Sequence, residues 1–136
     1  MRLVYYPGVW DLLHVGHVQA LSLARLAGDK LVVGVPSDEV VVEDKGEPPI
    51  IPLSDRVTML KALRMVDEVL PYYRLEFLTH LNLLRPQALA IGETWGNAAR
   101  HVEADKWCLL NGCRLLKIPR YPNESTSAIK QRIRGR

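Results

Sequence analysis

The segment from Gly8 to His17 most strongly constrains the fold of this chain. It follows an apolar run, Leu3–Tyr6, that predicts a β-strand, and it leads into an apolar-periodic run, Val15–Leu26, that predicts a helix. A glycine-containing loop between a strand and a helix N-terminus presents backbone N–H groups and the positive end of the helix dipole to an anion. The segment therefore predicts a phosphate site, into which His14 and His17 would point.

The rest of the chain alternates strand patterns with helix patterns. Further strands are predicted over 31–35, 66–70, 88–91 and 114–118, and further helices over 54–65, 75–84, 98–110 and 125–134. Ser54 and Asp55 are the expected caps of the second helix, and the polar stretch 36–49 is expected to be a loop. The alternation favours one α/β domain over 1–136: a Rossmann-like parallel sheet of about five strands flanked by helices.

Composition excludes several classes of protein. At 136 residues and 48% hydrophobic the chain can bury a core, which excludes a disordered protein. The net charge is only +3, and the basic end (Lys130, Arg132, Arg134 and Arg136) is expected to be a solvated helix end, so we expect no nucleic-acid partner. No apolar run approaches the roughly 20 residues that span a bilayer, so we expect no membrane association. Without a signal peptide, and with Cys108 and Cys113 at neither zinc nor disulfide-scaffold spacing, a cytoplasmic location is expected.

Chemically versatile residues follow the predicted strands. Ligands of parallel sheets bind beyond the carboxyl ends of the strands, near the point where the strand order reverses. Segments 8–17, 37–45, 92–95 and 120–127 should therefore meet at one rim. This rim would carry two histidines, a lysine, an arginine and three consecutive hydroxyls: His14, His17, Lys45, Arg120, Ser125, Thr126 and Ser127.

This set suits a polyphosphate. Imidazole N–H groups bind phosphate oxygens at neutral pH and bind them more strongly as charge develops. Lys45, on a flexible loop, would supply a compact charge, and Arg120 would supply a planar fork for two oxygens. Phosphoryl and nucleotidyl transfer need mainly such alignment and charge neutralisation.

Simpler interpretations stay open for several of these residues. The hydroxyls of 125–127 would also suit a helix cap, and Lys45 and Arg56 would also suit plain surface positions. Trp95 is placed either as a core aromatic or as a lid on a base. Asp11 is expected to hold its loop by accepting backbone hydrogen bonds, in preference to ligating a metal.

Three segments carry a resemblance to a known family. Gly8-x-x-Asp11-Leu12-Leu13-His14-x-Gly16-His17 resembles the first signature of the cytidylyltransferase-like nucleotidyltransferases. The segment 120–129 resembles their second signature, R-x-x-G-I-S-T-[ST]-x-I, and 92–95 resembles their G-D-D-W. The resemblance covers nearly the whole chain and is closest to the small bacterial glycerol-3-phosphate cytidylyltransferases, while heptose-phosphate adenylyltransferases and archaeal FAD synthetases are also similar.

The resemblance implies a reaction and a set of roles. A phosphate oxygen of an acceptor attacks the α-phosphorus of a nucleoside triphosphate that binds with Mg²⁺, and pyrophosphate leaves. His14 and His17 would stabilise the transition state, and Lys45 and Arg120 would hold the triphosphate and the acceptor phosphate. No side chain is assigned as a metal ligand, and a homodimer is implied. The nucleotide-binding residues implied are Gly8, Val9, Trp10, Gly16, Arg56, Gly92, Trp95, Ser125, Thr126 and Ser127.

The chain also departs from the family pattern. Val9 and Trp10 replace a threonine and a phenylalanine, and Thr94 replaces the second acid of G-D-D-W. Asn123 and Glu124 replace the glycine and isoleucine of the second signature. The stretch between Gly96 and Gly112 is also longer than in the small glycerol-phosphate enzymes, which leaves the acceptor open.

The sequence thus predicts transfer of CMP from CTP to a small phosphorylated alcohol such as glycerol 3-phosphate, because Arg120 at the start of the second signature favours the CTP branch. One alternative is an adenylyltransferase that uses ATP on a sugar phosphate of the heptose type or on FMN. A catalytically silent nucleotide-binding module is the alternative from another class, against which the intact His14, His17 and Lys45 count.

Overall fold

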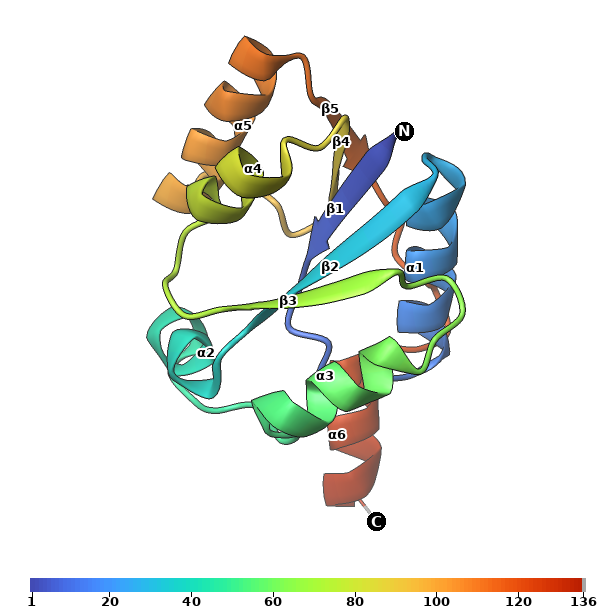
Figure 1. Cartoon of the computed structure of the whole chain (residues 1–136). Coiled ribbons are helices and arrows are strands. Elements are labelled where there is room, and N and C mark those ends of the chain that lie inside the picture. Colours follow the sequence, from blue (N-terminus) through green and yellow to red (C-terminus); the bar gives the residue numbers. More distant parts are fainter. Residues whose placement is uncertain (136) are drawn as a thin grey trace.

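Five parallel strands form the central sheet of the computed structural model, which describes residues 1–135 (Figure 1). Their order is β3-β2-β1-β4-β5. The first three strands are added outward from β1 on one side, and β4 and β5 are added on its other side, so the point where the strand order reverses lies between the neighbouring strands β1 and β4. The expected fold class is confirmed. The strands are β1 (Leu3–Pro7), β2 (Lys30–Pro36), β3 (Glu68–Tyr72), β4 (Ala88–Ile91) and β5 (Arg114–Lys117).

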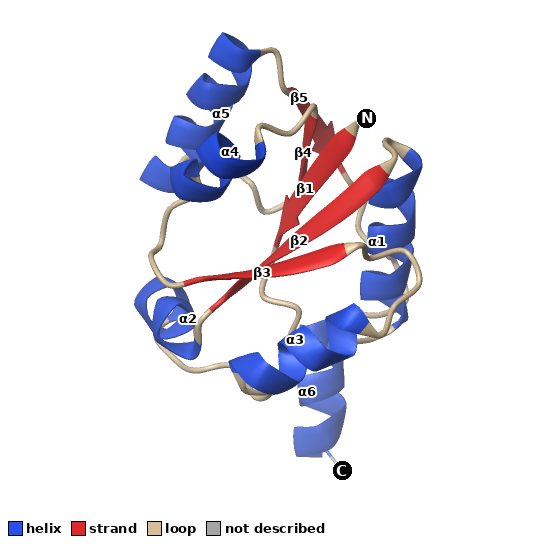
Figure 2. Ribbon diagram, in the orientation of Figure 1, coloured by secondary structure: helices blue, strands red, loops and turns tan. Residues whose placement is uncertain are grey.

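Helices cover both faces of the sheet (Figure 2). On one face, Leu21 and Leu60 pack with Val4 and Tyr6 in one core, and on the other, Leu81 and Trp107 belong to a second core around Tyr5. This alternation along β1 is the period of two that a strand imposes. The helices are α1 (Val15–Leu26), α2 (Asp38–Lys45), α3 (Leu53–Lys61), α4 (Leu78–Leu84), α5 (Ala99–Asn111) and α6 (Thr126–Gly135). Within residues 1–135, no helix is both long and apolar enough to cross a membrane.

The helix α2 corrects the prediction of a loop over 36–49. Ser37 Oγ accepts a hydrogen bond from the backbone nitrogen of Val40 and so caps the helix N-terminus, and Gly46 ends the helix with a left-handed φ of 85°. Of the residues in α2, only Val40 and Val41 are buried, and most of the others are charged. The apolar face is therefore too short to be recognised in the sequence. Lys45 therefore lies in the last turn of a helix and not on a flexible loop.

The boundaries of three other elements differ clearly from expectation. The helix α3 has Pro52 as its N-cap, not Ser54 or Asp55, and ends at Lys61. The strand β3 is shifted toward the C-terminus and includes Pro71, which an edge strand tolerates because one side of its backbone has no strand partner. The helix α4 begins three residues later than predicted, at Leu78.

Candidate active site

A cleft of about 600 Å³ opens at the carboxyl ends of the strands. It brings together the loop after β1, the helix α2, the segment after β4 and the first turns of α6. Nine of the predicted site residues line it: Gly8, Val9, Trp10, His17, Lys45, Gly92, Trp95, Thr126 and Ser127. The other five (His14, Gly16, Arg56, Arg120 and Ser125) are not among its lining residues.

Trp10 anchors the loop that joins β1 to α1. Its indole Nε1 donates a hydrogen bond of 3.0 Å to the carbonyl oxygen of Gly34 on β2, and its ring packs edge-on against Tyr6 and His17. Trp10 and Leu12 have φ values of 59° and 48°, a left-handed conformation that costs roughly 1–2 kcal/mol per residue. The buried indole, exposed over only 5% of its surface, is thus part of what holds a strained loop in place.

Asp11 ties this loop to other segments, as expected from its position. Its carboxylate accepts hydrogen bonds from the backbone nitrogens of Leu12 at 3.1 Å, Ile50 at 2.8 Å and Ile51 at 2.9 Å. Its carbonyl oxygen accepts a bond of 2.9 Å from the Thr126 hydroxyl at the start of α6. One buried acid therefore connects the β1–α1 loop, the segment before α3 and α6.

His14 and His17 form one unit at the start of α1. His14 is the N-cap, and its Nδ1 accepts a hydrogen bond of 3.0 Å from the backbone nitrogen of Gly16. The Nδ1 of His17 accepts a bond of 3.2 Å from the backbone nitrogen of His14. Because each Nδ1 is an acceptor, each neutral ring carries its proton on Nε2. A Cβ on Gly16 would lie 2.7 Å from the His14 ring, so the family glycine is needed to admit that ring.

Both imidazoles are neutral at pH 7. Burial, and to a lesser extent the neighbouring His14, lowers the pKa of His17 to about 4, while Asp11 opposes the shift. Burial also lowers the pKa of His14, against the effect of Glu124. The pair can therefore present N–H donors to a phosphate without adding full positive charges.

Positive charge at the cleft comes from three helices. Lys45 on α2 was predicted, whereas Lys130 on α6 and Arg100 on α5 were not. The Lys130 ammonium lies 3.9 Å from the Asp11 carboxylate, which corrects its placement in a solvated tail. Arg136, predicted in the same tail, lies outside the described residues. Its position four residues after Thr126 puts both on one face of α6, a signal that the sequence did contain. No local pattern indicates Arg100.

The three hydroxyls of the second signature have different roles. Ser125 Oγ accepts a hydrogen bond of 3.0 Å from the backbone nitrogen of Ala128 and so caps α6, as the simpler interpretation of this segment has it. Thr126 and Ser127 line the cleft. Arg120 is exposed, and its backbone nitrogen donates to Glu93 Oε1 at 3.3 Å.

Arg56 is a buried support and not a surface charge. It is 1% exposed, and its Nε donates a hydrogen bond of 2.8 Å to the Ile51 carbonyl oxygen. One terminal nitrogen donates to the Val9 carbonyl oxygen at 3.0 Å, and the other donates to Asp38 Oδ1 at 2.7 Å. These bonds join α3 to the β1–α1 loop and to α2. Its assignment as a nucleotide-binding residue stays a prediction.

Trp95 combines the two interpretations that the sequence left open. Its ring stacks on His101 with centroids 4.0 Å apart and faces Phe77 at 5.5 Å, and its Nε1 donates to Asp105 at 2.8 Å. It also lines the cleft, as do His101 and Phe77. A three-ring stack thus forms one wall of the cleft and holds the start of α5.

Comparison with known sequences decides the family. The family model described as cytidylyltransferase-like matches residues 5–132, which is nearly the whole chain. The chain belongs to the cytidylyltransferase-like family. The two-histidine loop and the hydroxyl-rich start of α6, described above, are both within the matched region.

Relatives in this family carry several different names. An ethanolamine-phosphate cytidylyltransferase of Arabidopsis thaliana is 54% identical over 67 residues, 49% of this chain and 16% of that protein. An FAD synthase of Pyrococcus abyssi is 44% identical over 90 residues, 65% of this chain and 61% of that protein. The bifunctional protein HldE of Methylobacillus flagellatus is 35% identical over 135 residues, 97% of this chain and 27% of that protein. The matched regions thus amount to between 16% and 61% of these three relatives.

A solved structure supports the fold. The crystal structure of a lipopolysaccharide core biosynthesis protein from Thermoplasma volcanium superposes with a TM-score of 0.77 at 24% identity, over 89% of this chain and 98% of that one. At this identity the similarity shows the arrangement of strands and helices alone.

Proposed function

We propose that this chain transfers CMP from CTP to a small phosphorylated alcohol, with release of pyrophosphate. The observation that carries the proposed reaction type is the pair of neutral histidines, both held at Nδ1 by backbone N–H groups, beside a cleft with lysines from two helices. The ethanolamine-phosphate cytidylyltransferase relative supports CTP as the donor.

In the proposed reaction an oxygen of the acceptor phosphate attacks the α-phosphorus of CTP. The bond from this phosphorus to the bridging oxygen breaks, and pyrophosphate leaves with the electron pair. The Nε2–H of His17 would donate to an α-phosphate oxygen as negative charge develops there. Lys45, Lys130 and the hydroxyls of Thr126 and Ser127 would hold the phosphates in line for the attack.

Magnesium fits this site as part of the triphosphate complex. Among residues 1–135 no group of three or more His, Cys, Asp or Glu side chains is placed to hold a metal ion. The Asp11 oxygens are already used by backbone N–H groups and Asp44 is paired with Arg100, so the residues suit an ion bound mainly by phosphates and water. Such an ion would neutralise phosphate charge.

A second candidate is an adenylyltransferase that acts on FMN or on a sugar phosphate. The FAD synthase and HldE relatives favour it. A silent nucleotide-binding module is the third, and the histidine pair counts against it because binding alone does not need two orientated donors.

A turnover assay separates these candidates. Pyrophosphate release is measured with Mg²⁺ and either CTP or ATP, against glycerol 3-phosphate, phosphoethanolamine, a heptose phosphate and FMN. We expect CTP with an alcohol phosphate to be fastest. Faster release with ATP would favour the second candidate, and triphosphate binding without release from any pair would favour the third. The homodimer implied by the family resemblance is tested separately by sedimentation equilibrium.

A further inference from the structure

An ion pair crosses the cleft between α2 and α5. A terminal nitrogen of Arg100 lies 2.8 Å from Asp44 Oδ1, and the two residues are 56 positions apart in the sequence. Both line the cleft, and their side chains are 19% and 28% exposed, so the pair is neither a free surface contact nor a buried one. Within residues 1–135, Arg100 is the one arginine that lines the cleft.

The surroundings hold Arg100 in this position. His101, the next residue, stacks on Trp95, whose ring also stacks with Phe77. The Nδ1 of His101 accepts a hydrogen bond of 3.0 Å from the backbone nitrogen of Gly96. The first turn of α5 is therefore fixed against α4. Because its base is fixed, the Arg100 side chain needs only to change its own rotamer to reach a ligand in the cleft.

The position of Arg100 is electrostatically unfavourable for the free protein. It lies in the first turn of α5, where the helix dipole disfavours a cation, and this first turn contains no acidic residue. The N-cap Ala98 makes no side-chain capping bond. The hydrogen bond to Asp44 uses a single donor of a guanidinium that has five, arranged as a fork that fits a phosphate in two-point contact. An anion that brings two or three acceptor oxygens would satisfy this group better than Asp44 does.

The adjoining wall suits the organic part of an acceptor. The cleft that Arg100 and Asp44 line also has apolar and aromatic side chains in its lining: Val40, Val41, Tyr72, Leu75 and Phe77. His17 and the start of α6, which suit the triphosphate, belong to other segments of the same cleft. A phosphomonoester could thus place its phosphate at Arg100 and its organic group against this wall.

We propose that Arg100 binds the phosphate of the acceptor, and that Asp44 occupies Arg100 in the free protein and competes with that phosphate. The inference rests on the proposed function and assigns an acceptor-binding residue that lies outside both signature motifs. Arg100 contributes to the affinity for the phosphomonoester. Asp44 lowers that affinity, because its ion pair with Arg100 must be separated before the phosphate binds. Binding of the triphosphate does not depend on Arg100 or on Asp44.

Steady-state kinetics with separate titration of the two substrates test this proposal. For Arg100→Gln we expect the KM of the acceptor to rise tenfold or more and the KM of CTP to stay within about twofold. For Asp44→Asn we expect the KM of the acceptor to fall. When Asp44→Asn is added to Arg100→Gln, we expect a smaller fall relative to Arg100→Gln alone. If the pair only joined α2 to α5, both single variants would lose the same contact and would shift both KM values alike, which would overturn the proposal.

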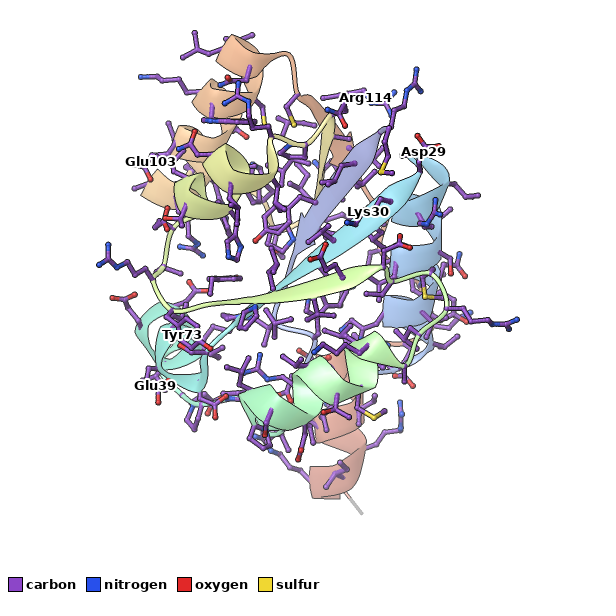
Figure 3. All side chains as sticks on the ribbon, in the orientation of Figure 1. Asp29, Lys30, Glu39, Tyr73, Glu103 and Arg114 are labelled. Carbon is purple, nitrogen blue, oxygen red and sulfur yellow. The ribbon has the colours of Figure 1, made fainter. Side chains whose placement is uncertain are left out.

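A matched control is Arg114→Gln. Arg114 is exposed at the start of β5, at the opposite end of the sheet from α2, as its label and that of Glu39 show in Figure 3. We expect both KM values to stay unchanged. Thermal unfolding of each variant reports loss of fold, and Arg100→Lys, which keeps the charge without the fork, is expected to recover only part of the acceptor affinity.

The outcome is distinguishable from failure of the proposed function. If the protein turns over an acceptor whose KM is the same in the wild type and in Arg100→Gln, this inference is overturned and the proposed function stands. If no triphosphate is turned over, the proposed function fails, and calorimetry with glycerol 3-phosphate, phosphoethanolamine and FMN still decides the inference. Binding to the wild type that weakens tenfold in Arg100→Gln supports it, while binding to neither protein, or equally to both, overturns it.

Discussion

The imidazole of His17 accepts a hydrogen bond from the backbone nitrogen of His14, and the two rings lie with their centroids 3.9 Å apart. His14 in turn caps the same helix through its own Nδ1. The orientation of each ring therefore depends on the backbone that the other ring holds. Such mutual support keeps two neutral donors aligned without a carboxylate partner, which suits the proposed binding of a triphosphate.

Replacing His17 with alanine tests the donor role. We expect kcat to fall by roughly a hundredfold or more, the loss typical of removing one transition-state donor, while the dissociation constant of CTP changes only a few-fold. Pyrophosphate release and calorimetry measure the two. His80→Gln is the matched control, because His80 bonds the Tyr5 hydroxyl in the core on the other face of the sheet. An unchanged kcat in His17→Ala would rule out the role.

The histidines predict a pH dependence of stability. The pKa of His17 falls to about 4 on folding, so between about pH 4 and 6.5 the unfolded chain binds more protons than the folded chain. The free energy of unfolding should then rise with pH across this range, by at most about 1.4 kcal/mol per pH unit for one group, and level off above it. Urea unfolding at several pH values measures the slope.

His17→Gln should reduce this slope without abolishing it, because the pKa values of His14, His80 and His101 are also lowered by burial. A slope equal to that of the wild type would contradict the buried, neutral state of His17.

Asp11→Asn should destabilise the protein by about 1–3 kcal/mol. One carboxylate oxygen becomes an NH₂ group that faces a backbone N–H, so a buried donor loses its acceptor. Urea unfolding measures the change. Asp29→Asn is the control, since Asp29 accepts a single bond from the exposed backbone nitrogen of Arg2, and its replacement should cost less than 1 kcal/mol. An equal loss in the free energy of unfolding for the two variants would show that the Asp11 contacts do not stabilise the β1–α1 loop.

Arg56→Lys separates structural support from phosphate binding. A lysine cannot reach the three acceptors that the guanidinium contacts, so we expect a loss of about 2–4 kcal/mol in the free energy of unfolding. The exposed Arg64→Lys is the control. At a temperature where both variants are folded, CTP affinity should change only a few-fold, whereas a large selective loss of affinity would assign Arg56 to the nucleotide site.

Local signals predicted some elements to the residue. The bounds of α1 and β4 agree with expectation, because a glycine, a cap and an uninterrupted apolar pattern are all local. The helix α2 was missed although its cap, its acidic first turn and its terminal glycine are all present, because its buried face consists of only Val40 and Val41. Short elements depend on what covers them more than on their own pattern.

By itself, the sequence determined the strand–loop–helix around His14 and His17, the alternation of strands and helices, and the residues that would follow each strand. Hydrophobic periodicity and the geometry of parallel strands suffice for these. Only the tertiary structure decided that Arg56 turns inward beneath the loop, that Lys130 reaches Asp11, and that Arg100 meets Asp44 across the cleft. These contacts join residues from 47 to 119 positions apart, and side chains so distant meet only when the strand order and the packing of the helices bring them together.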